Sequence, residues 1–128
     1  MPPSNATVIR FSPIAPDRLL ARAEQEYRRS ARYGISVFAA APDGTEDQDR
    51  LIQRILEASE LQNVKPETNQ KFWWLAEASA IYDLGYTFCK AGFLGEIDLH
   101  YSLLLGEAPT LEDSKRISDL FQPRKREQ

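Results

Sequence analysis

The run Ile35 to Ala40 constrains the fold more than any other segment of this chain, because its residues are almost all apolar and it is short. A run of this length suits a buried strand better than a core helix, which needs more residues. It ends in Pro42-Asp43-Gly44, whose residue types favour a tight turn. A strand with no regular polar alternation is typical of the middle of a sheet. The run therefore predicts a central strand against which helices pack.

Amphipathic segments on both sides of this strand predict two helices. Pro16 suits the first turn of a helix, and apolar residues then recur at helical spacing up to a stop near Gly34. After the turn, Thr45 and Gln48 form a capping-box pattern, and an apolar stripe continues to about Leu61. The chain thus alternates between strand and helix from its beginning.

The aromatic segment that starts at Phe72 has two interpretations. Residues 69–84 form one buried helix, or Phe72 to Ala76 form a strand and Ala78 to Leu84 a short helix. We prefer the strand and helix, since consecutive bulky aromatics suit a strand buried on two sides and Gly85 is a natural residue to follow a helix. We expect this strand to lie beside Ile35 to Ala40.

The other elements complete an α+β domain. They are a first strand over residues 6–11, a hairpin with strands over residues 86–91 and 97–105, and a last helix that Thr110 caps. The order β-α-β-α-β-α-β-β-α predicts a mixed five-stranded sheet with about four helices. We expect a single domain over residues 1–121 and a basic, disordered tail over residues 122–128.

The charge is distributed unevenly along the chain. The net charge is −3, but residues 1–34 carry six Arg against three acids and residues 35–121 carry seven bases against fifteen acids. A net-acidic central region does not favour nucleic acid as a partner, because phosphate contacts need a continuous basic surface. No apolar run is long enough to span a membrane, and no secretory signal is evident, so we expect a cytoplasmic protein without membrane contact.

Motifs that carry common chemistry are absent. The sequence has no phosphate-binding glycine loop, no nucleophile elbow, a single Cys89 and a single His100. Cys89 is expected to be a buried strand residue, and His100 lies on a predicted strand face with Asp98 and Ser102. We therefore expect no metal site and no cofactor.

Two groups of residues are candidates for binding. Arg18, Arg22 and Arg29 follow one stripe of the first helix, and arginine suits the recognition of phosphate or carboxylate. Acids interspersed with these arginines also fit a solvated helix face. Trp73 and Trp74 point to opposite faces of their predicted strand, so one of them is expected to be partly exposed and available to a partner.

Three scattered positions give a further comparison. Arg10 on the first strand, Ser36 on the next and Glu96 late in the chain are similar in order to the arginine, serine and glutamate of small ADP-ribosyltransferase-like toxins. The resemblance implies that these three residues act in catalysis, whereas in a metal-independent nuclease His100 would act together with arginines. The local motifs of that family around the serine and the glutamate are missing.

The sequence therefore favours a non-enzymatic protein-interaction module, such as an immunity protein, an antitoxin or an accessory subunit. Its partner is a protein or a second copy of the chain. The alternative is an enzyme, either a small ADP-ribosyltransferase-like toxin or a metal-independent nuclease toxin.

Overall fold

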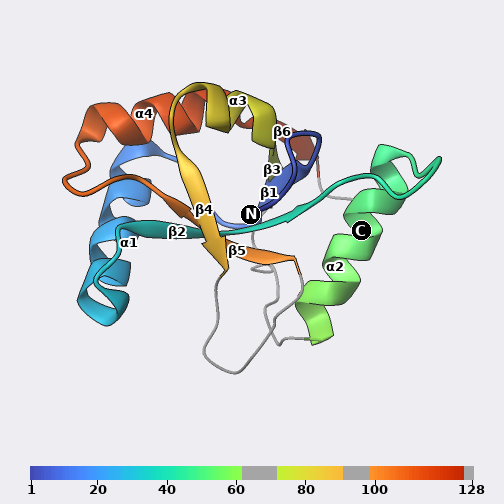
Figure 1. The fold of residues 1–128 in the computed structure, drawn as a ribbon, viewed down its shortest axis with the longest axis horizontal. Coiled ribbons are helices and arrows are strands. Elements are labelled where there is room, and N and C mark those ends of the chain that lie inside the picture. Colours follow the sequence, from blue (N-terminus) through green and yellow to red (C-terminus); the bar gives the residue numbers. More distant parts are fainter. Residues whose placement is uncertain (62–71, 91–98, 126–128) are drawn as a thin grey trace.

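The structure, a computed structural model, describes residues 1–61, 72–90 and 99–125. Strands and helices alternate along these ranges (Figure 1). The elements in chain order are β1 (Thr7–Arg10), α1 (Pro16–Ser30), β2 (Gly34–Ala40), α2 (Gln48–Leu61), β3 (Phe72–Glu77), α3 (Ala78–Asp83), β4 (Thr87–Lys90), β5 (His100–Leu104), α4 (Leu111–Leu120) and β6 (Gln122–Lys125).

The predicted α+β class is confirmed, but the sheet differs from the expected one in strand number and direction. It has six strands in the order β4-β5-β2-β1-β3-β6, and every neighbouring pair is antiparallel. A parallel pair requires the connecting helix to return the chain to the start of the previous strand. Here Ile9, near the end of β1, pairs with Phe38, and β2 already starts at Gly34, so β2 begins at the end of the sheet where β1 stops and runs back along it.

Two hydrophobic cores lie on the two faces of the sheet. Val8, Val37 and Ala39 point toward α1, α3 and α4, whereas Ile9 and Phe38 point toward α2. This follows from the alternation of side chains along a strand. Figure 1 shows the same division, with α3 and α4 along one side of the sheet and α2 apart from them. The central strand β2 is therefore covered on both faces over its second half.

The preferred interpretation of the aromatic segment is confirmed, although its neighbour in the sheet is not the expected one. Phe72–Glu77 form a strand and Ala78–Asp83 a short helix, after which Gly85 has a positive φ of 89°. The strand β3 pairs with β1 and β6, not with β2. Because β1 lies between β2 and β3, the first strand occupies the position that we expected for β3.

The C-terminal segment is a second correction. The expected disordered tail instead begins with β6, which pairs with β3 from Leu75↔Gln122 to Phe72↔Lys125. Pro123 cannot donate to a strand ladder, but it is tolerated because β6 lies at the edge of the sheet. The remaining tail residues, 126–128, lie outside the described ranges.

The two strands of the hairpin that we expected near the end of the chain are confirmed. β4 and β5 are antiparallel, with Thr87 opposite Leu104 and Lys90 opposite Tyr101. Of the described residues in the expected range 97–105, the second strand includes His100–Leu104 and leaves out Leu99 and Leu105. The expected loop of this hairpin and the candidate residue Glu96 lie outside the described residues.

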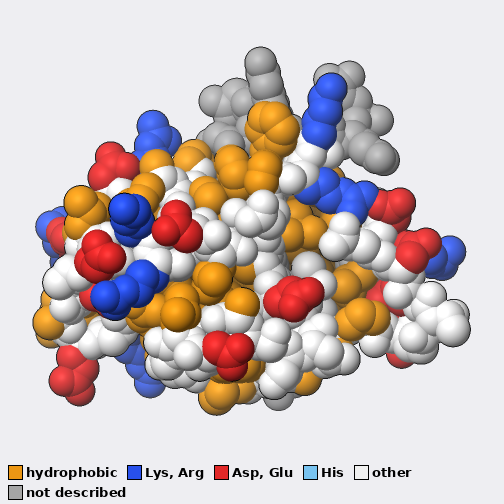
Figure 2. Space-filling model, turned by 90° about the horizontal axis from the view of Figure 1, so that it is seen from above, with side chains coloured by type: hydrophobic (Ala, Val, Ile, Leu, Met, Phe, Trp, Pro, Cys, Tyr) orange, Lys and Arg blue, Asp and Glu red, His pale blue; other side chains and the backbone are white. Residues whose placement is uncertain are grey.

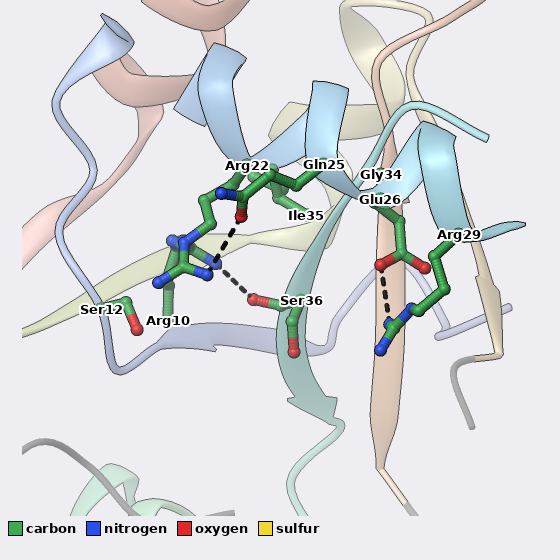
Figure 3. A pocket seen from close by; sticks show the side chains of 9 residues that line it. All are labelled: Arg10, Ser12, Arg22, Gln25, Glu26, Arg29, Gly34, Ile35 and Ser36. Atoms are coloured by element: carbon green, nitrogen blue, oxygen red, sulfur yellow. Dashed lines mark hydrogen bonds and ion pairs between the residues drawn. The ribbon is translucent and has the colours of Figure 1, made fainter. Parts of the chain in front are cut away.

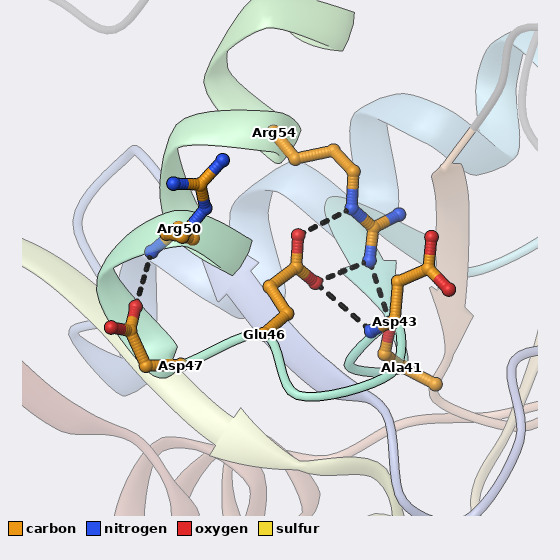
Figure 4. A network of polar contacts seen from close by, with 6 residues as sticks. All are labelled: Ala41, Asp43, Glu46, Asp47, Arg50 and Arg54. Carbon is orange, nitrogen blue, oxygen red and sulfur yellow. Dashed lines mark hydrogen bonds and ion pairs between the residues drawn. The ribbon is translucent and has the colours of Figure 1, made fainter.

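The helix α2 begins differently from its sequence pattern. The carboxylate of Asp47 accepts the N–H of Arg50 at 2.9 Å, so Asp47 caps the helix and Thr45 does not. Glu46 accepts two hydrogen bonds from Arg54, at 2.8 and 3.0 Å, and Arg54 also donates to the Ala41 carbonyl (Figure 4). These bonds lower the pKa of the Glu46 carboxyl and fasten the turn after β2 to the helix.

Candidate functional site

A polar cavity of about 380 Å³ lies between α1 and the first half of β2 (Figure 3). The helix contributes residues at positions i, i+3, i+4 and i+7, which share one face of a helix. We call this cavity the arginine pocket. Its lining residues are Arg22, Gln25, Glu26 and Arg29 of α1, Arg10 and Ser12 at the end of β1, and Gly34, Ile35 and Ser36 of β2.

The pocket forms where two neighbouring strands separate. The pairing of β1 with β2 ends at Ile9↔Phe38, and the chain then turns away through Pro13 toward the start of α1. Pro13, with its fixed φ and no backbone donor, does not favour renewed pairing of this segment with β2 before α1 begins. The first residues of β2 are thereby left beside α1 instead of beside β1.

Arg10 bridges this separation. Its Nε donates to the Pro13 carbonyl at 3.3 Å and one terminal nitrogen donates to the Ser36 carbonyl at 2.7 Å. The residue is only 4% exposed, yet within the described ranges no carboxylate lies within ion-pair distance of it. Burial, and then the nearby charge of Arg22, lower the pKa of Arg10 to about 10. The group therefore stays charged at neutral pH.

The other two arginines of the pocket differ in whether a carboxylate neutralises their charge. Arg29 forms an ion pair with Glu26 at 2.7 Å on the same helix. Arg22 donates to the side-chain oxygen of Gln25 at 3.3 Å, which is a neutral acceptor. The guanidinium groups of Arg10 and Arg22 overlap in the view of Figure 3, and the charge of Arg22 contributes to the lowered pKa of Arg10. Two positive charges thus meet at one end of the pocket.

The sequence identified part of this pocket. Of the arginines predicted to bind, Arg22 and Arg29 line it, whereas Arg18 is exposed and does not. Arg10 was singled out only through the resemblance to transferases, and the structure makes it the buried centre of the pocket. The feature of the sequence that could have identified Arg10 is its position as a charged residue at the end of an otherwise apolar strand.

A second polar contact joins Ser36 to His100. The Ser36 hydroxyl lies 2.6 Å from Nε2 of the imidazole, whose ring stacks on Phe38 at a centroid distance of 4.7 Å. Burial lowers the pKa of His100, while Glu26 acts in the opposite direction. Nδ1 of His100 is buried and has no hydrogen-bond partner among the described residues. The ring is therefore held by stacking and one hydrogen bond.

This contact differs from the expected row of Asp98, His100 and Ser102. Ser102 lies directly opposite Ser36 in the ladder, and His100 lies opposite Phe38, so His100 reaches Ser36 diagonally across two strands. Asp98 and Glu96 lie outside the described residues. Of the four candidate catalytic residues, the structure brings three together: the Ser36 carbonyl contacts Arg10, and its hydroxyl contacts His100.

The two tryptophans point to opposite faces, as expected. Trp73 is 7% exposed in the core beneath α2, and its indole nitrogen has no hydrogen-bond partner among the described residues. Trp74 is half-buried and packs on the other core. Its ring lies 6.1 Å from that of Phe72, which is 42% exposed. These two rings form a partly exposed aromatic pair, far along the sheet from the hairpin of β4 and β5.

The described part of the chain has neither a cluster of metal ligands nor a membrane-spanning helix. Cys89 is on β4, as expected, but it is half-buried. Residues 1–61, 72–90 and 99–125 contain no group of three His, Cys, Asp or Glu side chains that could hold a metal ion. No helix within these ranges has the length and apolar character needed to cross a bilayer.

The surface charge is mixed where the helices cover the sheet. Figure 2 shows basic and acidic side chains alternating among apolar ones on this face, without a continuous basic field. Comparisons of the chain with known protein families, with characterised proteins and with solved structures find no match. The residues of the site are therefore the basis for any assignment of function.

Proposed function

We propose that this protein is a protein-interaction module that binds an acidic group of its partner in the arginine pocket. One observation carries the proposal: the guanidinium of Arg10 is buried in the pocket and donates to no carboxylate among the described residues. A buried charge without a counter-ion costs several kcal/mol in typical proteins. An anion that enters the pocket removes this cost, and that gain favours binding.

The surroundings of Arg10 support recognition from outside. Arg22 is exposed, lies on the pocket face of α1 and adds a second positive charge that attracts an anion as it approaches. Ser12 and Gln25 add neutral hydrogen-bonding groups to the wall. The exposed Phe72 and half-buried Trp74 form an aromatic surface of the kind that is enriched in protein interfaces.

The test begins with partners recovered from the source cell at moderate salt and identified by mass spectrometry. The affinity of each purified partner is then measured by calorimetry for the wild type, Arg22→Gln and Arg18→Gln. Both substitutions remove one exposed positive charge from α1, but only Arg22 lines the pocket. We expect Arg22→Gln to weaken binding by about tenfold or more and Arg18→Gln to leave it nearly unchanged. Equal effects of the two variants would contradict the proposal.

The second candidate function is an enzyme, either ADP-ribosyltransferase-like or a metal-independent nuclease. It is favoured by the contact of the Ser36 hydroxyl with the His100 imidazole at 2.6 Å, with Arg10 on the same residue's carbonyl. A serine next to a neutral imidazole is the arrangement of a nucleophile and its base. Turnover of NAD or RNA by the wild type, lost in His100→Ala, would establish this function instead.

A further inference from the structure

We propose that the group bound in the arginine pocket is a phosphate monoester in its doubly charged form. This inference rests on the proposed function and specifies its ligand. It starts from the charges of the lining residues. Arg29 and Glu26 are paired at 2.7 Å and cancel, whereas Arg10 and Arg22 have no carboxylate partner within the described residues. Two uncompensated positive charges match a phosphate monoester, which carries about −1.5 to −2 at neutral pH.

The hydrogen-bond donors of the pocket match the same group. Of the five N–H donors of an arginine, two of Arg10 are used by the carbonyls of Pro13 and Ser36. The other donors of its guanidinium have no acceptor among the described residues. Among the described residues, the one hydrogen bond of the Arg22 side chain is the 3.3 Å bond to Gln25. A phosphate presents three terminal oxygens, so it accepts from both guanidinium groups at once.

A structural role for Arg10 alone does not account for the pocket. The bonds to Pro13 and Ser36 explain why an arginine bridges the separated strands. They do not explain why a second guanidinium lies next to it, because Arg22 adds repulsion that lowers the pKa of Arg10. A carboxylate would neutralise one of the two charges, whereas a dianion neutralises both.

The test compares anions at constant ionic strength, with the full chain and calorimetry as the readout. Inorganic phosphate, O-phosphoserine and a phosphoserine peptide are compared with acetate and with a glutamate peptide of the same sequence. We expect each phosphate compound to bind at least about tenfold more tightly than its carboxylate counterpart. Arg22→Gln should lose about tenfold of the phosphate affinity, and Arg18→Gln should retain it.

Arg10→Gln is a second variant at the centre of the pocket. We expect it to abolish measurable phosphate binding. Because it also removes the bonds to Pro13 and Ser36, its folding is checked by circular dichroism. Arg22→Gln remains decisive if Arg10→Gln does not fold.

The pH dependence separates a dianion from a monoanion. Phosphate monoesters lose their second proton near pH 6, so affinity should rise several-fold between pH 5.5 and 7.5. Sulfate stays doubly charged and serves as the control for titration of the protein. The titratable and charged groups at the pocket are Arg10, Arg22, Arg29 and Glu26, and His100 lies next to them, hydrogen-bonded to Ser36 and within reach of the charge of Glu26. A sulfate affinity that changes as much as the phosphate affinity would overturn the inference.

Two outcomes separate this inference from the proposed function. Equal affinities for phosphate and acetate, both weakened by Arg22→Gln, would disprove the phosphate assignment and leave the pocket as an acidic-group site. If neither Arg22→Gln nor Arg10→Gln changes the affinity for any anion, both the phosphate assignment and the proposed function are disproved. The comparison of the phosphoserine peptide with O-phosphoserine identifies the molecule that carries the phosphate. A peptide that binds about tenfold more tightly indicates a phosphorylated protein. Equal affinities indicate a small phosphate monoester.

Discussion

Arg10 and His100 both have a lowered pKa because burial disfavours their charged forms, but the consequences are opposite. A pKa of about 10 leaves Arg10 charged at neutral pH, so the fold keeps a buried cation next to an open pocket. The pKa of His100 falls from a value that is already below neutral, so its ring is uncharged. Arg10 is therefore suited to hold an anion, whereas His100 takes part in its hydrogen bond with Ser36 as a neutral ring.

The lowered pKa of His100 makes stability depend on pH. Below about pH 6.5 the unfolded chain takes up a proton that the folded chain resists, so the free energy of unfolding should fall as the pH decreases from about 7 to 5. Above about pH 7 both states are neutral at this position and the contribution disappears. Because His100 is the only histidine, His100→Gln should flatten the curve in this window. Urea unfolding at a series of pH values measures it, and parallel curves for the two proteins would contradict the prediction.

The residues of the pocket show what a sequence can and cannot predict at this scale. Helical spacing placed Arg22 and Arg29 on one face, since that spacing is a local property. The contact of His100 with Ser36 depends on the register of β2 against β5. These residues are 64 positions apart, and no local pattern determines such a register.

At the scale of single elements, the N-terminal caps of α4 and α2 show that the same sequence pattern can form a cap in one helix and not in another. Thr110 forms the expected cap of α4, in a capping box with Asp113, and this lowers the pKa of the Asp113 carboxyl. Thr45 and Gln48 have the same spacing as a capping box, but α2 begins two residues later than that pattern requires. The sequence predicts that a helix begins near this point more reliably than it predicts which residue caps it.

This difference gives a test on α2. Asp47→Ala should lower the free energy of unfolding by about 0.5–2 kcal/mol, because the N–H of Arg50 loses its acceptor. Thr45→Ala should change it by less than about 0.5 kcal/mol, as is usual for surface positions. Chemical denaturation of both variants measures the two effects. A larger loss for Thr45→Ala would show that the helix starts earlier than the structure places it.

For the whole molecule, the alternation of strands and helices predicted the class, but not the arrangement of the sheet. Each strand was recognisable from a short apolar or aromatic run, except β6, whose sequence Gln-Pro-Arg-Lys has no apolar pattern. This strand forms because the open edge of β3 offers it backbone partners. Pairing of that kind is a property of the folded sheet and leaves no signal in the segment itself.

A chain that ends at Phe121 tests the importance of β6. Removal of the strand takes away the ladder from Phe72↔Lys125 to Leu75↔Gln122. The loss of several backbone hydrogen bonds should lower the free energy of unfolding by at least about 2 kcal/mol. Trp73, now 7% exposed, should become accessible to acrylamide, which fluorescence quenching measures.

Arg124→Ala serves as the control for this truncation. Arg124 contacts Gln48 and Asp49 of α2, and these contacts are exposed. The substitution leaves the ladder of β6 intact and should cost less than about 1 kcal/mol. Similar losses for the control and the truncated chain would mean that the side-chain contacts, and not the strand, stabilise this edge.

The two outer strands of the sheet, β4 and β6, also limit how copies of the protein assemble. Within the described residues each outer strand has four residues, β4 carries Lys90, and β6 carries Pro123 and Lys125. Short edges with proline and lysine are poor templates for the addition of another strand. Growth of one continuous sheet from molecule to molecule, the first step toward fibrils, is therefore disfavoured at both edges. Copies that pair would have to do so through side chains on their faces.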